Sequence, residues 1–456
     1  MSKVQSIRRG LACLTVGALC IAAGANARAD EQSDRIKALE QRLERSLQLI
    51  DKLSSRVAEL ERAARAAPVA AQAASGAQPA QAAVVEDHAK SIAALQQSVD
   101  QIADGLSKNA NDTGIPVHGF IDVGAGWSSR QDPVPLRGFN AGSLDLYLTP
   151  QIGARVKSLV ELVVEFDEDG ESSIDMERVQ IGYTLSDELT LWAGRFHTPF
   201  GLWNTSYHHG ANLRPSISRP VFIDFEDRGG LISAHSVGVW ANGKTALGDG
   251  KLTYDAFLAN GPSVRGRELE LNPFTDDNHG KMLGLNLGYR PAGVLSGLSV
   301  GLHGFSSSVG RYNDDGSLRG TTRLRALGGY FGYDGRDWET IGEFYRFSNS
   351  SDSGSVLSNA GFLHVGRTFG AFTPYARYER ASLNPRDDYF RSLRNGRSYT
   401  HLVAGARYAI DANSSLKLEL RHSRETAAAQ IDAAGAEIDV PEASFQRALF
   451  QYSIAF

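Results

Sequence analysis

An alternation of apolar and polar residues with a period of two runs through the C-terminal three quarters of this chain. In its last segment, Ala448, Phe450, Tyr452, Ile454 and Phe456 alternate with residues that include arginine, glutamine and serine. Since successive side chains of a strand point to opposite faces, this period makes one face of the strand apolar. A closing strand with an apolar face and a terminal aromatic residue is typical of a barrel whose outer surface meets lipid.

The same alternation recurs often enough to build a closed wall. The clearest segments are 117–127, 144–148, 160–166, 179–185, 252–258, 283–289, 402–410 and 416–420. We predict an all-β transmembrane barrel of about 16 antiparallel strands over residues 117–456. Pro150 and Pro374 interrupt apolar runs, so about 14 or 18 strands stay open as alternatives. A soluble β-sandwich is a further alternative, although the inner faces of its two sheets would need to be more apolar.

The connections between these segments alternate in length. Short turns are expected on one side, and longer polar loops on the other, near 128–142, 167–173, 197–234, 260–279, 308–320, 349–357, 384–396 and 425–442. In bacterial outer-membrane barrels the short turns face the periplasm and the long loops face outward. An even number of strands then leaves both ends of the barrel in the periplasm.

The first 116 residues follow other patterns. Residues 1–29 fit a secretory signal peptide, with a basic start, an apolar run and a small-residue cleavage site. Residues 30–62 carry apolar residues at heptad spacing between charged faces, which predicts an α-helical coiled coil in the periplasm, either dimeric or trimeric. Residues 63–85 form an Ala/Gln/Pro linker, and residues 86–112 predict a second, shorter helical or coiled-coil segment.

Composition excludes several classes of protein. Cys13 and Cys20 both lie in the signal peptide, so the mature chain has neither disulfides nor cysteine nucleophiles. A net charge of -5 carries no nucleic-acid signature. The sequence shows no recognisable spacing of serine, histidine and acid, so we expect neither an enzyme nor a cofactor. No metal is expected at His208 and His209, because adjacent histidines of an extended chain point to opposite sides.

Charged residues fill the positions opposite the apolar faces, where they would line an aqueous lumen. These lumen candidates are Asp122, Asp145, Glu161, Glu165, Arg178, Arg323, Arg325, Arg407, Lys417, Glu419, Arg421 and Arg447. Between residues 117 and 456 there are five lysines and 28 arginines. Arginine presents a planar fork that matches carboxylate and phosphate oxygens, so the set predicts a passage that prefers anions. The alternative is that these residues only keep the pore wet and pair with one another.

The connection 197–234 is the longest, and structureless loops of this length are usually functional. It mixes aromatic residues with charged ones, among them Phe200, Trp203, Phe222 and Phe225 with Arg214, Arg219 and Arg228. A loop that folds into a lumen needs aromatic residues to dock on the wall and charges to select at the opening. We therefore predict that it constricts the pore, with an external cap as the alternative.

The ten residues from Trp192 to Gly201, WAGRFHTPFG, resemble a signature of the phosphate-selective porin O/P-like superfamily. The plan of a coiled coil followed by a barrel is similar to that of the DcaP-like porins. This resemblance implies sixteen strands, a trimer and an anion-passing pore, with Gly194, Arg195, Pro199 and Gly201 as a structural motif. The barrel is poor in lysine, unlike the lysine-rich funnel of phosphate-selective relatives, which favours organic anions or broad selectivity.

Together these patterns predict an outer-membrane porin for passive diffusion of small polar solutes, with anions preferred. A substrate-specific importer, for example of a siderophore, and a structural tether to the cell wall are the alternatives. The expected partners are outer-membrane lipid and lipopolysaccharide, a small-molecule solute and two further copies of the chain in a homotrimer, with no nucleic acid. The candidate pore or substrate-binding residues are Arg178, Arg195, Arg214, Arg219, Arg228, Arg323, Arg325, Arg407, Lys417, Arg421 and Arg447.

Overall fold

The computed structural model describes residues 116–130, 136–166, 172–208, 210–271 and 280–456. The signal peptide, the coiled coil, the linker and the second helical segment predicted for residues 1–112 lie outside this part of the chain. Within it, none of the helices is long and apolar enough to span a bilayer.

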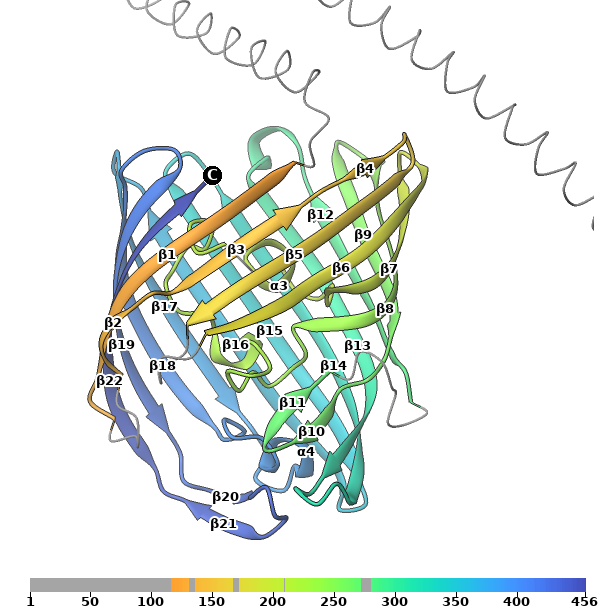
Figure 1. The fold of residues 1–456 in the computed structure, drawn as a ribbon, viewed down its shortest axis with the longest axis vertical. Coiled ribbons are helices and arrows are strands. Elements are labelled where there is room, and N and C mark those ends of the chain that lie inside the picture. Colours follow the sequence, from red (N-terminus) through yellow and green to blue (C-terminus); the bar gives the residue numbers. More distant parts are fainter. Residues whose placement is uncertain (1–115, 131–135, 167–171, 209, 272–279) are drawn as a thin grey trace, which may run out of the picture. The chain divides into compact units, whose positions relative to one another are not determined.

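The described residues form an antiparallel β-barrel (Figure 1). The main sheet has 20 strands, and four of these are short segments, which leaves sixteen wall strands. The short segments are β2 (Arg137–Asn140), β4 (Gln151–Ile152), β10 (Ser263–Arg265) and β11 (Glu268–Glu270). The wall strands are β1 (Val117–Ser128), β3 (Ser143–Leu148), β5 (Val156–Phe166), β6 (Ser172–Ser186), β7 (Leu189–His197), β8 (His235–Leu247), β9 (Gly250–Ala259), β12 (Met282–Arg290), β13 (Leu298–Tyr312), β14 (Leu318–Asp334), β15 (Trp338–Ser351), β16 (Gly354–Arg367), β17 (Phe372–Ser382), β18 (Tyr399–Ala409), β19 (Ser414–Glu425) and β22 (Ala443–Ala455).

The first and last strands close the barrel. β22 pairs with β1 in an antiparallel register that runs from Phe120 opposite Ala455 to Ser128 opposite Arg447. Beyond this register the backbone N–H groups of Gly119 and Phe456 each donate to the carbonyl of the other, at 2.9 and 3.0 Å. Closure leaves the wall without an unpaired edge, which a strand in lipid cannot tolerate. The predicted count of about sixteen antiparallel strands is confirmed.

An apolar belt covers the outer face of the wall. Leu302, Leu327, Phe344, Leu420 and Phe450 are large apolar side chains that stand exposed there. Aromatic residues gather near the short turns, namely Tyr333, Trp338, Phe369, Phe372 and Tyr408. Such a belt with an aromatic rim matches the hydrocarbon layer of a membrane and its interface.

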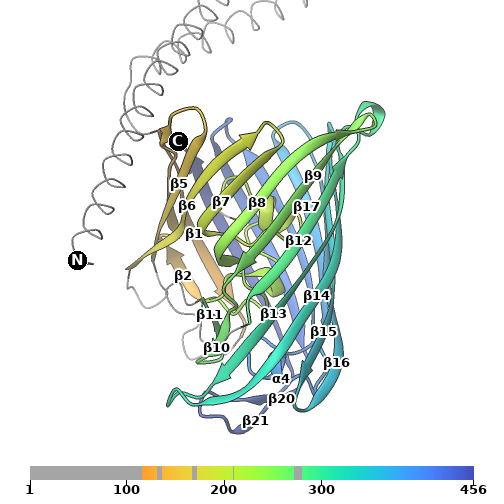
Figure 2. The same cartoon turned by 90° about the vertical axis from the view of Figure 1, so that its right-hand side faces the viewer.

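Two of the predicted long loops are instead tight connections. β13 continues to Tyr312 and β14 begins at Leu318, while β15 continues to Ser351 and β16 begins at Gly354, whose φ is 108°. Figure 2 shows β14, β15 and β16 extending toward the end of the barrel that carries the long loops. The prediction failed because strands outside the membrane need no apolar face, so serine, threonine and glycine continue the ladder there.

The helices among the described residues are short. They are α3 (Trp203–Ser206), η1 (Val221–Ile223), η2 (Gly293–Leu295) and α4 (Asp388–Arg391), and a separate hairpin consists of β20 (Ala428–Ile431) and β21 (Glu437–Val440). The first two belong to the connection between β7 and β8, which determines the shape of the lumen.

Candidate functional site in the barrel lumen

The connection between β7 and β8 folds into the barrel, where Figure 1 shows α3 surrounded by the wall strands. Its ends are joined by a hydrogen bond of 2.8 Å from the Thr198 N–H to the Ala234 carbonyl. We call residues 198–234 the lumen loop. Its predicted aromatic anchors are buried: Phe200, Trp203, Phe222 and Phe225.

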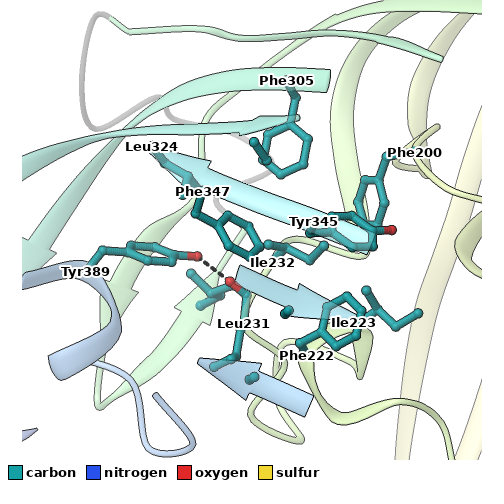
Figure 3. Close-up of a cluster of buried hydrophobic side chains, with 14 of the residues drawn as sticks. Phe200, Phe222, Ile223, Leu231, Ile232, Phe305, Leu324, Tyr345, Phe347 and Tyr389 are labelled. Carbon is teal, nitrogen blue, oxygen red and sulfur yellow. Dashed lines mark hydrogen bonds between the residues drawn. The ribbon is translucent and has the colours of Figure 1, made fainter. Parts of the chain in front are cut away.

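Apolar packing attaches one side of the lumen loop to the wall (Figure 3). The rings of Phe200 and Phe305 lie 5.6 Å apart between centroids, and Phe222 meets Tyr345 edge-on at 5.0 Å. Further ring contacts and buried aliphatic side chains from β13 to β16 complete a hydrophobic core inside the barrel. This side of the lumen is therefore filled by packed side chains.

Wall carboxylates fix the lumen loop by accepting hydrogen bonds from its backbone. The pairs are Asp145 with Gly210, Glu343 with Leu202 and Trp203, Glu379 with Val221, and Glu419 with Ile217 and Ser218. These backbone N–H groups have no strand to pair with, and leaving them unpaired inside the barrel would cost free energy. Carboxylates accept such bonds strongly, so β3, β15, β17 and β19 each anchor a part of the loop.

Two cationic side chains of the wall also hold the lumen loop, by donating hydrogen bonds to its carbonyl groups. The buried Arg377 guanidinium donates to the carbonyls of Ser218 and Arg219 at 2.8 and 3.3 Å, and its Nε lies 2.8 Å from Glu379. The Lys417 ammonium donates to the carbonyls of Ala211 and Arg214. Arg377 and Lys417 are each only 1 % exposed. Their charges therefore hold the loop and do not face open water.

The outer loops also contact the lumen loop. The Tyr389 hydroxyl, at α4, donates to the Leu231 carbonyl at 2.7 Å (Figure 3). Asp387 begins this helix and is buried, and its burial raises the pKa of the carboxyl to about 6. Hydrogen bonds from Asn349 and the Tyr389 amide act in the opposite direction. The mouth on the long-loop side is thus narrowed by packed polar loops.

A cavity of about 190 Å³ lies beside α3. Its lining includes Leu202 and Thr205 from the lumen loop, and Asp255, Arg290 and Tyr330 from the wall. The Trp240 indole N–H, next to this wall, donates to Asp255 at 3.1 Å. The cavity therefore combines polar wall groups with Leu202 and Tyr330, which belong to or pack against the apolar core.

Comparison with known proteins identifies the fold. No model of a known protein family matches the sequence, and no curated protein matches it. The chain is similar in structure to the anion-selective porin from Comamonas acidovorans, with 15% identity, a TM-score of 0.50, and coverage of 75% of this chain and 99% of that one. The chain has the fold of an outer-membrane porin.

Two further solved structures have weaker similarity to this porin fold. OmpT, an outer membrane protein of Vibrio cholerae in a trimer form, has 10% identity, a TM-score of 0.48, and coverage of 75% of this chain and 99% of that one. The outer membrane channel DcaP of Acinetobacter baumannii has 12% identity, a TM-score of 0.44, and coverage of 75% and 97%.

The porin fold gathers part of the predicted residues on one side of the lumen. We call this group, from β18, β19, β22 and the lumen loop, the cationic wall: Arg214, Arg407, Lys417, Arg421 and Arg447. Arg407 is opposite Lys417 in the strand register, and Arg421 is opposite Arg447. Arg407 also pairs with Glu339 at 2.9 Å, and Arg421 bonds to His401 at 2.9 Å. Lys417 is covered by the lumen loop, whereas Arg421 and Arg447 place like charges directly across from each other.

A second group of predicted arginines is ion-paired on the side of β5 to β8. The pairs are Arg178 with Glu161, Arg195 with Glu177 at 3.2 Å, and Arg228 with Glu165 at 2.6 Å. A register shift between β5 and β6 leaves Glu177 as an extra residue beside Arg178. Such a bulge turns two successive charged side chains toward the same region.

Arg219 and the acidic lumen candidates have structural partners. Arg219 is buried within the lumen loop, where its guanidinium donates to the carbonyls of His208 and Ile223. Asp122 accepts hydrogen bonds from Ser143 and Gln451, while Asp145 and Glu419 hold the loop.

The prediction is wrong for Arg323 and Arg325, which lie on the outer face of β14. Their neighbours Leu324 and Ala326 are buried in the core inside the barrel. We assumed that apolar residues of every strand face lipid. On β14 the apolar residues also point inward, because the packed interior of the lumen gives them an apolar contact.

Steric contacts explain why two positions of the signature that the sequence resembles are glycines. Gly194 has a φ of 128°, and a Cβ there would lie 2.0 Å from the Val179 carbonyl oxygen. Gly201 has a φ of 61°, and a Cβ there would lie 2.2 Å from Glu343 Oε2. Only glycine adopts these conformations at little cost and lets the loop approach the wall this closely.

Several important residues were missed by reasoning from the sequence. Glu343, Arg377 and Glu379 hold the lumen loop, and Asp255 and Arg290 line the cavity. Arg377 and Glu379 are charged residues two apart on a strand, which was an available signal for an inward face. Glu343 lies where the sequence has no clean alternation, since inward Tyr345 and Phe347 are as apolar as outward Phe344.

Proposed function

We propose that this protein is an outer-membrane porin for passive diffusion of small polar solutes. The lumen loop carries this proposal, because a wall of sixteen strands encloses more space than side chains fill, and the loop narrows it with charged groups. The apolar belt supports residence in the outer membrane. A barrel that only tethers the membrane to the cell wall would have no use for such a loop.

We further propose that the pore prefers anions. The support is the cationic wall, in which Arg421 and Arg447 are opposite each other. Arginine keeps its charge in any surrounding and binds carboxylate or phosphate oxygens with a planar fork. The similarity in fold to a porin described as anion-selective agrees with this proposal.

Selectivity is expected to depend on these two arginines. Changing both to glutamate, Arg421→Glu with Arg447→Glu, places negative charge in the passage, so the ratio of anion to cation permeability should fall several-fold. The measurement is the reversal potential of the purified protein in a planar bilayer across a potassium chloride gradient.

Arg325→Glu is the matched control, because it changes an arginine on the outer face of β14. It should leave the reversal potential unchanged. A cation preference of the unaltered protein would refute the anion proposal, and absence of any conductance would refute the pore.

We also propose that the outer face binds the phosphate groups of lipopolysaccharide. Directly beyond the apolar belt, arginines point outward from β14, β15, β17 and β19. They are Arg325, Arg346, Arg380 and Arg424. A cavity of about 650 Å³ touches Arg380 and Arg424. Phosphate groups at the membrane surface would meet these guanidinium groups.

Lipopolysaccharide retention should therefore drop when these arginines become glutamine. We expect the fourfold variant of Arg325, Arg346, Arg380 and Arg424 to co-purify with much less lipopolysaccharide than the unaltered protein. The amount per barrel is measured after extraction in mild detergent. Arg407→Gln, which changes the lumen, is the control, and equal retention in both variants would contradict a phosphate-binding role.

The homotrimer implied by the family resemblance remains part of this proposal. The heptad pattern in residues 30–62 supports association of chains through a coiled coil, either dimeric or trimeric. The mass of the detergent-solubilised complex by light scattering tests it, since a monomer or a dimer would exclude the trimer.

A further inference from the structure

We propose that His197, His208 and His235 form a binding site for a divalent transition metal ion, with Zn²⁺ as the reference ion. His197 ends β7, His235 begins β8, and His208 follows α3 in the lumen loop. One possible ligand atom from each of the three lies within 4.8 Å of the other two. His208 and His235 are buried, and His197 is half-buried.

The distances suit a tetrahedral ion. Zinc binds imidazole nitrogen at about 2.0–2.1 Å, so nitrogens that share one ion stand about 3.3 Å apart. The Nε2 atoms of His208 and His235 are 2.8 Å apart, slightly closer than this. The rings of His197 and His208 lie against each other with centroids 3.8 Å apart, so these two rings would have to turn and separate for all three to bind the same ion.

The other nitrogens of two of the rings are already oriented. His208 Nδ1 lies 2.7 Å from Asn204 Oδ1, and His235 Nδ1 lies 3.1 Å from Glu226 Oε2. A proton on each Nδ1 donates to these acceptors, and a bound ion would take the place of the proton that His235 Nε2 shares with His208 Nε2 and Glu177 Oε2 in the metal-free protein. Metal-binding histidines are held in the same way by a carboxylate or an amide behind the ring.

Carboxylates as well as arginines surround the three rings. Glu177 Oε2 lies 2.8 Å from His235 Nε2, in reach of a fourth coordination position, and Glu161 Oε2 lies 3.5 Å from His197 Nε2. With Glu226, these carboxylates offset the arginines that contact the same groups, namely Arg178, Arg195 and Arg219. Three imidazoles and one carboxylate favour zinc, cobalt, nickel or copper over calcium and magnesium.

The ion would join three separate segments of chain. Both strand ends are already paired with each other, with His197 opposite His235 in the register, and His208 adds the lumen loop. Binding would therefore cross-link the loop to the wall at the point where it enters the lumen. This inference goes beyond the proposed porin function and does not depend on it.

The test measures metal binding by the full-length protein, purified in detergent without a histidine tag and stripped of metal. One Zn²⁺ per chain is expected in equilibrium dialysis. His208→Gln and His235→Gln should each weaken binding by about 100-fold or more, and Asn204→Ala by about 10-fold to 100-fold. His364→Gln is the matched control, because His364 is also a buried wall histidine, 3.5 Å from Glu339, and it should bind like the unaltered protein.

The heat-dependent shift in gel mobility, typical of intact barrels, shows whether each variant has folded. A protein that binds no Zn²⁺, or variants that all bind equally, would overturn the proposal. Should the variants fail to fold, Co²⁺ added to the unaltered protein decides the matter. An intense visible absorption, the sign of four-coordinate cobalt, supports the site, and a weak six-coordinate spectrum or none overturns it.

Discussion

Replacing residues 199–233 by a short glycine-containing turn is expected to raise the single-channel conductance several-fold. The replacement is geometrically simple, because Thr198 and Ala234 are already hydrogen-bonded across the ends of the loop. It removes the segment that fills the lumen, so the passage widens toward the full width of the wall. Solutes that differ in size should then enter liposomes at similar rates, whereas the unaltered protein should distinguish them.

A matched control shortens another connection. Replacing residues 427–441, which include the hairpin of β20 and β21, removes chain at the mouth and leaves the lumen loop in place. We expect a much smaller change in conductance from this variant. Equal conductance of the unaltered protein and the loop-replaced variant, measured on barrels that show the folded gel mobility, would contradict a constricting role.

The variant Arg377→Leu is expected to destabilise the folded protein by about 3–5 kcal/mol. Arg377 and Glu379 form an ion pair in which both side chains are fully buried. Removing the guanidinium leaves the carboxylate without its main partner in a region of low dielectric, and it also removes the donors to Ser218 and Arg219. Thermal unfolding in detergent, followed by circular dichroism, measures the loss.

Two comparison variants make this result specific. Arg380→Leu changes an exposed arginine on the same strand and should alter stability little. The double variant Arg377→Leu with Glu379→Leu removes both charges, so it should recover part of the lost stability. If Arg377→Leu and Arg380→Leu unfold at the same temperature, the attachment of the loop through Arg377 is not important for stability.

Most of the wall could be predicted from the sequence. Val160, Leu162, Leu418, Leu420 and Phe450 follow the period of two, and the structure places them on the lipid side. Such strands are predictable because their apolar face meets lipid and their other face is polar. The prediction of the two faces failed on β14 and β15. There the inward face is apolar as well, so apolar and polar residues no longer alternate.

The lumen could be predicted only in part. The alternation placed Lys417, Arg421 and Arg447 inside, as the structure does. It could not show that Lys417 is covered by the lumen loop whereas Arg407 keeps 22% of its side chain exposed. This difference depends on where the loop docks, which a local pattern does not contain.

The sequence by itself predicted the barrel and a strand number of about sixteen, because lipid imposes a regular pattern on every spanning strand. Only the tertiary structure decided which charges face the passage, and that His197, His208 and His235 meet. Those contacts join residues far apart in the chain, and their energies come from packing and hydrogen bonds that form only after the loop enters the closed wall.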